Sequence, residues 1–262
     1  MGLRVHIGKV DAPLASGAEL LLPEGAARHV QVMRMQPGEE LNIFDGSGQE
    51  WVARIVRMGK RDVAVQVTEV AHVDKELADH VTLAVGVPAN DRMDTVVEKA
   101  AELGVRTIQP LMCERSVLRL AGERAAKKVA HWQAVAISAC EQCGRTVVPE
   151  VLPVQSIESW LANQGRETLP QQKAVLSLRN ARWVGDWLKD VAAPTQATEP
   201  SGNWVFLSGP EGGLSPQEEE AARLAGFQAI SLGTRTLRAD TAPITVMAIL
   251  STRQPPTGQM SA

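Results

Sequence analysis

The residues best suited to chemistry lie near the C-terminal end of the chain, where a strand, a glycine-rich turn and a helix are expected in succession. Residues 204–207 are apolar and predict the strand, and residues 208–213 have the sequence Ser-Gly-Pro-Glu-Gly-Gly. Ser215 is suited to the N-cap of the helix, and Glu218 completes a capping box. Glycines let backbone groups approach a ligand closely, and open α/β sheets bind ligands at the carboxyl ends of strands. The segment predicts a ligand-binding turn, although a simple connecting turn would have a similar composition.

A second candidate turn follows the first along the chain. Residues 229–232 predict a short strand that runs into the glycine-containing segment 233–242, after which a helix is expected from about Pro243. Two adjacent strands that end in such loops would form one cleft, with Arg238 and Asp240 among its polar groups. The alternative is that these two side chains form an exposed ion pair, which contributes little stability.

The cysteines allow a weaker hypothesis. Cys140 and Cys143 form a C-x-x-C pair inside a helical apolar pattern. A zinc site needs a second pair of ligands, and the spacing of Cys113 and His131 fits no standard zinc site. We therefore favour buried structural thiols over metal or redox chemistry, and we predict no metal.

These segments must be positioned by two kinds of structure. Residues 1–73 predict a small β-rich domain, with strands at 3–7, 40–44, 51–56 and 63–67 and a helix within 24–35. Short strands in close succession favour a small barrel. From residue 74 the pattern becomes one of alternating strands and helices, which predicts an α/β domain with a mostly parallel sheet over residues 74–253. Its strands are expected at 81–87, 107–112, 147–152, 174–178 and 204–208, a loop at 190–203, and a flexible tail at 254–262.

The overall charge limits the possible partners. The formal net charge is −3, and charged residues make up 22% of the chain. Polyanion binding normally requires clustered Lys and Arg, so any RNA site must be a local patch. No stretch is long and apolar enough for a membrane span, and the first ten residues do not form a signal peptide. We expect a cytoplasmic protein.

The combined motifs resemble the 16S ribosomal RNA uracil-N3 methyltransferase family, which belongs to the SPOUT class of trefoil-knot enzymes. The resemblance covers nearly the whole chain. The chain departs from the family pattern at Asp240, where Glu is more frequent, and at Ala89, where a basic residue is frequent. The matching segments are 209–213 with Ser215 and Glu218, 232–233, 237–241, 98–104, 113–116, 139–145, 148–149, Arg34, Gly38 and 44–48.

The resemblance implies a fold and a cofactor. The fold would be a C-terminal SPOUT α/β domain with a deep trefoil knot and a small N-terminal PUA-like β-barrel that binds RNA. The methyl donor S-adenosylmethionine would be held in the knot, and the enzyme would be a homodimer, with residues 243–250 as a candidate interface. The implied cofactor-binding residues are Leu207, Gly209, Pro210, Glu211, Gly212, Gly213, Leu232, Gly233, Leu237, Arg238 and Thr241.

The resemblance also implies methylation of N3 of a specific uridine in the 16S rRNA of the small ribosomal subunit. A carboxylate could accept the N3 proton and an arginine could stabilise charge on the ring carbonyls. The candidate catalytic residues are Arg115, Glu141, Arg145, Arg238 and Asp240. Glu141 and Arg145 could instead form an ordinary i,i+4 ion pair. Arg4, Arg34, Arg54 and Arg57 could contact RNA phosphates or simply be part of a solvated surface.

Two other functions remain open from the sequence. The enzyme could methylate tRNA or a ribose 2′-hydroxyl, as relatives in this class do. The chain could also be a non-catalytic RNA-binding assembly factor, for which the barrel and the basic residues would suffice. The intact glycine turns favour the enzyme.

Overall fold

The computed structural model describes residues 2–71, 73–164, 171–191 and 202–253. Contacts divide the chain into two units. The N-terminal unit contains the residues up to Glu76 together with Ile137–Val148, and the C-terminal unit contains Leu77–Ala136 and Pro149–Pro255. The boundary expected after residue 73 lies close to Glu76, but residues 137–148 were expected in the C-terminal domain. The tail predicted at 254–262 lies outside the described residues.

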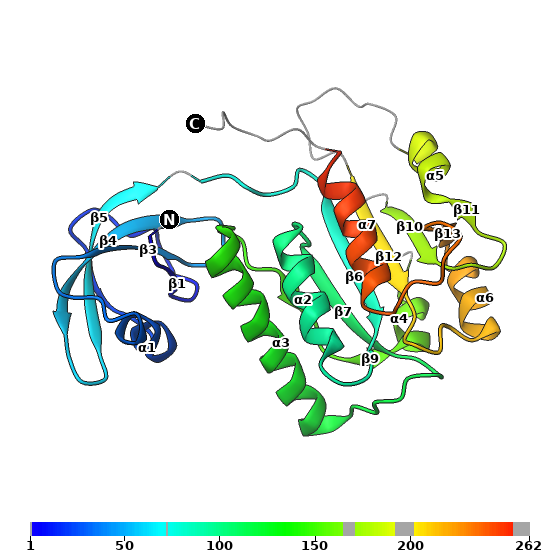
Figure 1. Cartoon of the computed structure of the whole chain (residues 1–262), viewed down its shortest axis with the longest axis horizontal. Helices are drawn as coiled ribbons and strands as arrows, with labels where there is room; N and C mark the ends of the chain where they lie inside the picture. The colour runs from blue at the N-terminus through cyan, green and yellow to red at the C-terminus, as the bar shows by residue number, and fades with distance from the viewer. Residues whose placement is uncertain (1, 72, 165–170, 192–201, 254–262) are drawn as a thin grey trace. The chain divides into compact units, whose positions relative to one another are not determined.

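The N-terminal unit is built on a five-stranded sheet with the order β1-β3-β4-β5-β2. Figure 1 labels β1, β3, β4 and β5 of this sheet. β1 (Arg4–His6) runs parallel to β3 (Glu40–Phe44). β4 (Glu50–Met58), β5 (Val63–Ala71) and β2 (Glu19–Leu21) complete the sheet through antiparallel pairs. Alternate residues of β4 and β5 are buried, as expected for strands with one face on a core. The predicted β-rich character is confirmed, and β2 is an additional strand.

A short helix covers part of this sheet. α1 (Glu24–Val32) buries Ala26, Ala27 and Val30 in the same core as Trp51. The helix lies within the predicted range of 24–35 and ends at Val32. Arg34 has a φ of +56°, which is incompatible with a continuing helix.

The C-terminal unit contains an eight-stranded sheet in which all pairings are parallel. The central strands are β10 (Gln171–Leu176), β12 (Asn203–Ser208) and β6 (His80–Gly86). The main path of the sheet is β11-β13-β10-β12-β6-β7-β8, and β9 also pairs with β7. The predicted parallel α/β sheet is confirmed. The remaining strands are β7 (Thr107–Met112), β8 (Glu150–Val151), β9 (Gln155–Ser156), β11 (Arg182–Trp183) and β13 (Gln228–Ser231).

Helices connect these strands. α2 (Arg92–Glu102) buries its apolar residues at helical spacing, and Gly104, with a φ of +94°, follows its last turn. α3 (Gly122–Cys143) is one continuous helix, and its last residues, from Ile137, belong to the N-terminal unit. The other helices are α4 (Ile157–Ala162), α5 (Val184–Val191), α6 (Pro216–Leu224) and α7 (Thr241–Ser251).

The course of the chain before α7 places a long loop at the carboxyl ends of the strands. β13 pairs with β10 on the side opposite β12. α7 nevertheless contacts β12 and α2 (Figure 1). Residues 232–240 therefore return past the end of β10, and this return is where the resemblance predicts the knot.

Several predicted elements differ from the structure in their limits, among them β5, which extends to Ala71 beyond the predicted 63–67. The strand expected at 147–152 is reduced to Glu150–Val151, and the strand expected at 174–178 ends at Leu176. The loop expected at 190–203 overlaps the end of α5, and residues 192–201 lie outside the described part of the chain. None of the helices within the described ranges is both long enough and apolar enough to cross a membrane.

Candidate active site

A pocket lies at the carboxyl ends of three adjacent strands in the C-terminal unit. Its volume is about 700 Å³, and it is lined by the loops that follow β10, β12 and β13. These strands are neighbours in the sheet, in the order β13-β10-β12, so their three loops leave the sheet side by side. A volume of this size is within the usual range for small-molecule sites. The two predicted glycine loops therefore border one pocket, but their strands are not adjacent as expected, because β10 lies between β12 and β13.

The loop after β12 is shaped by its glycines. A Cβ atom on Gly209 would lie 2.7 Å from the backbone nitrogen of Leu214, so only glycine fits there without a shift of the loop. Gly213 has a φ of +68°, and its N–H donates to Pro210 O at 2.8 Å. On the other side, a Cβ on Gly86 would lie 2.6 Å from Cδ of Pro210. The loop is thus tightly packed and presents its backbone to the pocket.

The helix that follows this loop begins at the predicted capping box. Ser215 Oγ accepts from Glu218 N, and Glu218 Oε2 accepts from Ser215 N at 2.8 Å. Glu218 is buried, and its other oxygen accepts from Glu114 N at 2.7 Å. One carboxylate therefore satisfies backbone donors on two loops, and it joins the end of β7 to the glycine loop.

Two arginines fix the same loop from outside. Arg115 lines the pocket, and its Nη1 donates to Gly212 O at 3.0 Å. Arg92 donates to Glu211 Oε1 at 2.9 Å, and this carboxylate also accepts from Ala89 N. Glu211 therefore links the glycine loop to the start of α2. Arg115 thus holds the loop by its backbone, and Arg92 holds it by the side chain of Glu211.

The loop after β13 supplies the opposite wall. Ser231 Oγ donates to Gly233 O at 2.8 Å, and Gly233 has a φ of +122°. Arg238 lines the pocket with an exposed side chain, and its carbonyl accepts from Thr241 N. Asp240 is the N-cap residue of α7, but its side chain makes no capping hydrogen bond.

The loop after β10 was not among the predicted site residues. Leu176, Ser177, Leu178 and Arg179 all line the pocket. The predicted strand extended to residue 178, so it included Ser177 and Leu178, which lie beyond the end of β10. The signal that could have found them is the parallel sheet itself, since the carboxyl ends of neighbouring strands lie at one edge. Arg92 and Arg235 also line the pocket and were not predicted.

The predicted cofactor-binding residues divide into two groups. Eight of them line the pocket, and three do not. Leu207 is fully buried within β12, so its side chain belongs to the core. Gly233 follows the lining residue Leu232, and Thr241, the first residue of α7, precedes the lining residue Ala242. The residues that line the pocket are Gly209, Pro210, Glu211, Gly212, Gly213, Leu232, Leu237 and Arg238.

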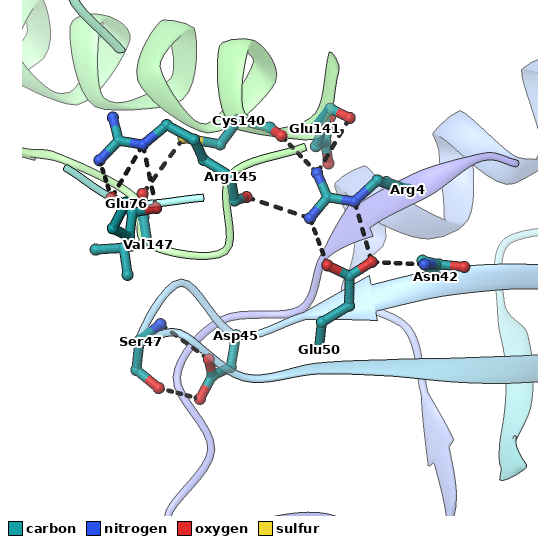
Figure 2. Close-up of polar contacts among 10 residues, drawn as sticks. All are labelled: Arg4, Asn42, Asp45, Ser47, Glu50, Glu76, Cys140, Glu141, Arg145 and Val147. Atoms are coloured by element: carbon teal, nitrogen blue, oxygen red, sulfur yellow. Dashed lines mark hydrogen bonds and ion pairs between the residues drawn. The ribbon is translucent and has the colours of Figure 1, made fainter. Parts of the chain in front are cut away.

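Two of the predicted catalytic residues belong to the N-terminal unit (Figure 2). α3 ends at Cys143 and Gly144 has a φ of +87°, so Arg145 does not lie on a helical face with Glu141. Arg145 is buried and forms an ion pair with Glu76. Glu141 accepts from His6 N at 2.9 Å. Glu141 and Arg145 therefore do not form the i,i+4 ion pair offered as an alternative, and each contacts a different partner. These contacts indicate structural roles, and catalytic roles for the two residues stay predictions.

Arg4, one of the arginines predicted to contact RNA, is the centre of a buried network. Figure 2 shows its guanidinium between Glu50 and the end of α3. It pairs with Glu50 Oε2 at 2.8 Å and donates to Cys140 O at 2.6 Å and Arg145 O at 3.2 Å. Its side chain is 5% exposed. Cys140 O also accepts from Gly144 N at 3.1 Å, and Arg4 Nη1 lies 3.4 Å from the next carbonyl, Glu141 O, so Arg4 binds the carbonyls of the last turn of α3.

The other three arginines of that prediction are exposed. Arg54 pairs with Glu40 at 2.9 Å, and Arg57 pairs with Asp62 at 2.6 Å. Arg34 follows α1 in the left-handed conformation described above. Their exposure is compatible with phosphate contacts, which stay a prediction.

The three thiols have different environments. Cys113 is buried, and this burial raises the pKa of its thiol to about 12. A hydrogen bond with Cys140 is the largest cause that lowers the pKa of the Cys143 thiol to about 6, while the pKa of Cys140 is raised. Within the described ranges, no group of three or more His, Cys, Asp or Glu is placed to hold a metal ion.

Comparison with known proteins agrees with this geometry. Residues 75–251 match the family described as RNA methyltransferase domain, and residues 22–68 match the family described as RNA methyltransferase PUA domain. The ribosomal RNA small subunit methyltransferase E of Bacillus subtilis is 29% identical over 85% of this chain and 85% of its own.

Two solved structures are similar over nearly their whole length. The ribosomal RNA small subunit methyltransferase E of Neisseria gonorrhoeae, bound to S-adenosyl methionine, is 36% identical with a TM-score of 0.82, over 97% of this chain and 98% of its own. A methyltransferase of Legionella pneumophila, in complex with the cofactor SAM, is 33% identical with a TM-score of 0.85 over the same shares. The chain therefore belongs to the SPOUT-class RNA methyltransferase family that includes the proteins named ribosomal RNA small subunit methyltransferase E.

Proposed function

We propose that this protein is an S-adenosylmethionine-dependent methyltransferase that modifies N3 of a uridine in the 16S rRNA of the small ribosomal subunit. The observation that carries the proposal is the pocket of about 700 Å³ at the ends of β10, β12 and β13, whose walls are three loops of one sheet edge. The names of the similar proteins support an rRNA of the small subunit as the substrate. The choice of uridine N3 comes from the resemblance of the motifs.

The residues present fit the cofactor. The glycine loop offers backbone groups at a position where a Cβ on Gly209 would not be accommodated. Leu176, Leu232 and Leu237 add apolar surface to the pocket, which suits an adenine ring. An arginine side chain of the lining can pair with the carboxylate of the methionine part. When bound, S-adenosylmethionine supplies an electrophilic methyl group.

The protein must then position the uracil base and accept the proton that leaves its N3. Uracil N3 becomes nucleophilic when its imide proton is lost, and an ordered approach to the methyl group is the largest contribution the site can make. Asp240 is the carboxylate of the predicted set that borders the pocket-lining residues Ala239 and Arg238. We assign it the role of proton acceptor. Arg238 and Arg115 would stabilise negative charge on the ring carbonyls.

We further propose a homodimer, with α7 in the interface. α7 buries Pro243, Val246, Met247 and Leu250, and Ile244 and Ile249 on its remaining surface are only partly covered. Such a helix, apolar on more than one face, gains stability when a second surface covers it. Light scattering coupled to size-exclusion chromatography would give twice the chain mass if this is correct, and the mass of one chain if it is not.

The function is tested by methyl transfer from labelled S-adenosylmethionine. Small ribosomal subunits that lack the modification, the naked 16S rRNA and total tRNA would be offered in parallel. The proposal expects label in the small subunits or in 16S rRNA, and less of it with a Gly209→Ala variant at limiting cofactor. Label in tRNA alone would show that the substrate is tRNA and that the reaction is still methyl transfer from S-adenosylmethionine. Failure of the protein to bind S-adenosylmethionine in calorimetry would overturn the proposal.

A further inference from the structure

The pocket concentrates positive charge in a chain whose net charge is negative. Five arginines line it, and only two glutamates do. Both glutamates are engaged, because Glu211 pairs with Arg92 and Glu219 accepts a hydrogen bond from Ser177 Oγ at 3.1 Å. The chain as a whole carries a formal charge of −3. This pocket is thus a local basic cluster of the kind that polyanion binding requires.

Arg179 and Arg235 are the most informative members of the cluster. They follow β10 and β13, which are direct neighbours with Leu176 opposite Ile230. Both side chains are exposed. In the part of the chain that the structure describes, neither forms an ion pair with an acidic side chain. Their guanidinium groups therefore come from adjacent loops at the same pocket and are available to an external anion.

The backbone of the β10 loop is held in place although its arginine side chain is exposed. Arg179 N donates to Ser177 Oγ at 3.0 Å, and Arg179 O accepts from Arg223 Nη2 at 3.2 Å. Ser177 N also donates to Ile230 O of β13 at 2.9 Å. A fixed backbone reduces the entropy lost when the side chain binds. The geometry of the loop is that of a prepared anion-binding position.

The cofactor does not account for this much positive charge. S-adenosylmethionine carries a sulfonium and an ammonium group against one carboxylate at neutral pH. A single arginine can pair with that carboxylate, and the remaining arginines would repel the rest of the molecule. The surplus therefore points to the other substrate, since RNA contributes one negative charge with every phosphate.

An apolar side chain beside the arginines favours RNA over a small inorganic anion. Leu178 precedes Arg179, lines the same pocket and is 56% exposed. Unstacked bases in single-stranded RNA bind to apolar and planar side chains, while arginines hold the neighbouring backbone. The β10 loop presents both kinds of surface in consecutive residues.

We propose that Arg179 and Arg235 bind the RNA phosphates that flank the target nucleotide, and that Leu178 contacts the exposed base. This inference rests on the proposed function, and it places the decisive RNA contacts at the catalytic pocket in addition to any contacts of the N-terminal unit. The two arginines act as substrate-positioning residues, because they hold the backbone on either side of the base that is methylated.

The test compares Arg179→Ala, Arg235→Ala and the double variant with the matched control Arg106→Ala. Arg106 is exposed and precedes β7, at the amino ends of the strands. Its replacement by Ala therefore removes the same charge from the opposite edge of the same sheet. Methyl transfer to unmodified small subunits would be measured as a function of subunit concentration at several salt concentrations. Calorimetry would give the affinity for S-adenosylmethionine without RNA.

The expected result is a KM for the subunits that rises about tenfold in the double variant, while kcat changes little. The slope of log affinity against log salt concentration should become less steep by about the amount that one phosphate contact contributes for each arginine removed. The affinity for S-adenosylmethionine should stay unchanged or increase, and Arg106→Ala should behave as the unaltered protein.

Two results would overturn the inference. An unchanged subunit KM and salt dependence in the double variant would show that these arginines do not contact RNA. A loss of S-adenosylmethionine affinity with an unchanged subunit KM would assign them to the cofactor. Both results differ from failure of the proposed function, in which the unaltered protein would not bind S-adenosylmethionine or would not methylate any RNA.

Discussion

At the scale of single residues, Glu218 stabilises more than the helix that it caps, because it also binds the backbone of a second loop. Its carboxylate accepts hydrogen bonds from Ser215 N and Glu114 N while it is buried. Replacing Glu218 with Ala leaves these donors without their acceptor, which we expect to lower the free energy of unfolding by about 2–3 kcal/mol. Urea unfolding would measure the change. Glu220→Ala is the control, because Glu220 is exposed on the same helix and should cost well under ~1 kcal/mol. Equal effects of the two substitutions would contradict this role.

Gly209 is the residue on which the shape of the cofactor loop depends most directly. In Gly209→Ala the added Cβ would meet the backbone of Leu214 and Gly213. The loop must therefore shift, and we expect the Kd for S-adenosylmethionine to rise at least about tenfold, equivalent to ~1.4 kcal/mol. Gly25→Ala is the matched control, because no atom lies within 4 Å of a Cβ at Gly25. Calorimetry in which Gly209→Ala binds as tightly as the unaltered protein would contradict the loop's role.

Cys143 gives a prediction about pH. Its pKa is lowered to about 6, first by the hydrogen bond with Cys140 and further by Arg145, so the thiolate should predominate at neutral pH. The rate of alkylation at Cys143 should rise with pH to a plateau above pH 7, and Cys113 should not react in the folded protein. Because the pKa in the folded state is depressed, the associated stabilisation is fully present above pH 9 and is lost as the pH falls through 6. A titration midpoint near 9 for Cys143, followed by mass spectrometry, would contradict the assignment.

At the scale of secondary-structure elements, the end of α3 depends on a side chain from β1. Arg4 pairs with Glu50 and donates to carbonyls of the last turn, all within the N-terminal unit. Arg4→Met would leave Glu50 as a buried charge without this partner, and we expect a loss of about 3–5 kcal/mol in the free energy of unfolding. Arg54→Met is the control, because its pair with Glu40 is exposed and is worth about 1 kcal/mol or less.

The outcome of this comparison separates two roles of Arg4. A structural role predicts that Arg4→Met unfolds at lower urea concentration and that Arg4→Met/Glu50→Gln recovers part of the loss, since the buried charge is removed. A role in RNA binding alone predicts unchanged unfolding and weaker binding to the small subunit. Unchanged unfolding would therefore contradict the structural account.

Sequence reasoning was most accurate for elements whose signals are local. β3, β7 and the capping box of α6 follow from residues that are adjacent in the chain, and the structure confirms them. The β10 loop was missed because an apolar run does not mark where a strand stops and a pocket begins. The partners of Arg4 and Arg145 could not be predicted at all. They are separated by long stretches of sequence, and only the folded chain brings them together.

At the scale of the whole molecule, the fold explains where the reaction would take place. All pairings in the sheet of the C-terminal unit are parallel, so the loops that follow its strands gather at one edge, and the three loops after β10, β12 and β13 enclose one pocket. Alternating strands and helices were sufficient to predict this sheet. The route of residues 232–240 back to α7 was not deducible from residue spacing, because chain threading leaves no periodic pattern in a sequence.

The central claim is that this pocket directs a methyl group from S-adenosylmethionine to N3 of a uridine in small-subunit rRNA. The most direct measurement is mass spectrometry of nucleosides and of mapped fragments, after unmodified small subunits are incubated with the protein and labelled cofactor. The account predicts label in 3-methyluridine at a single 16S position, and less label with the Gly209→Ala variant when the cofactor is limiting. Label in another nucleoside or in a ribose methyl group, from protein that binds the cofactor, would contradict the claim.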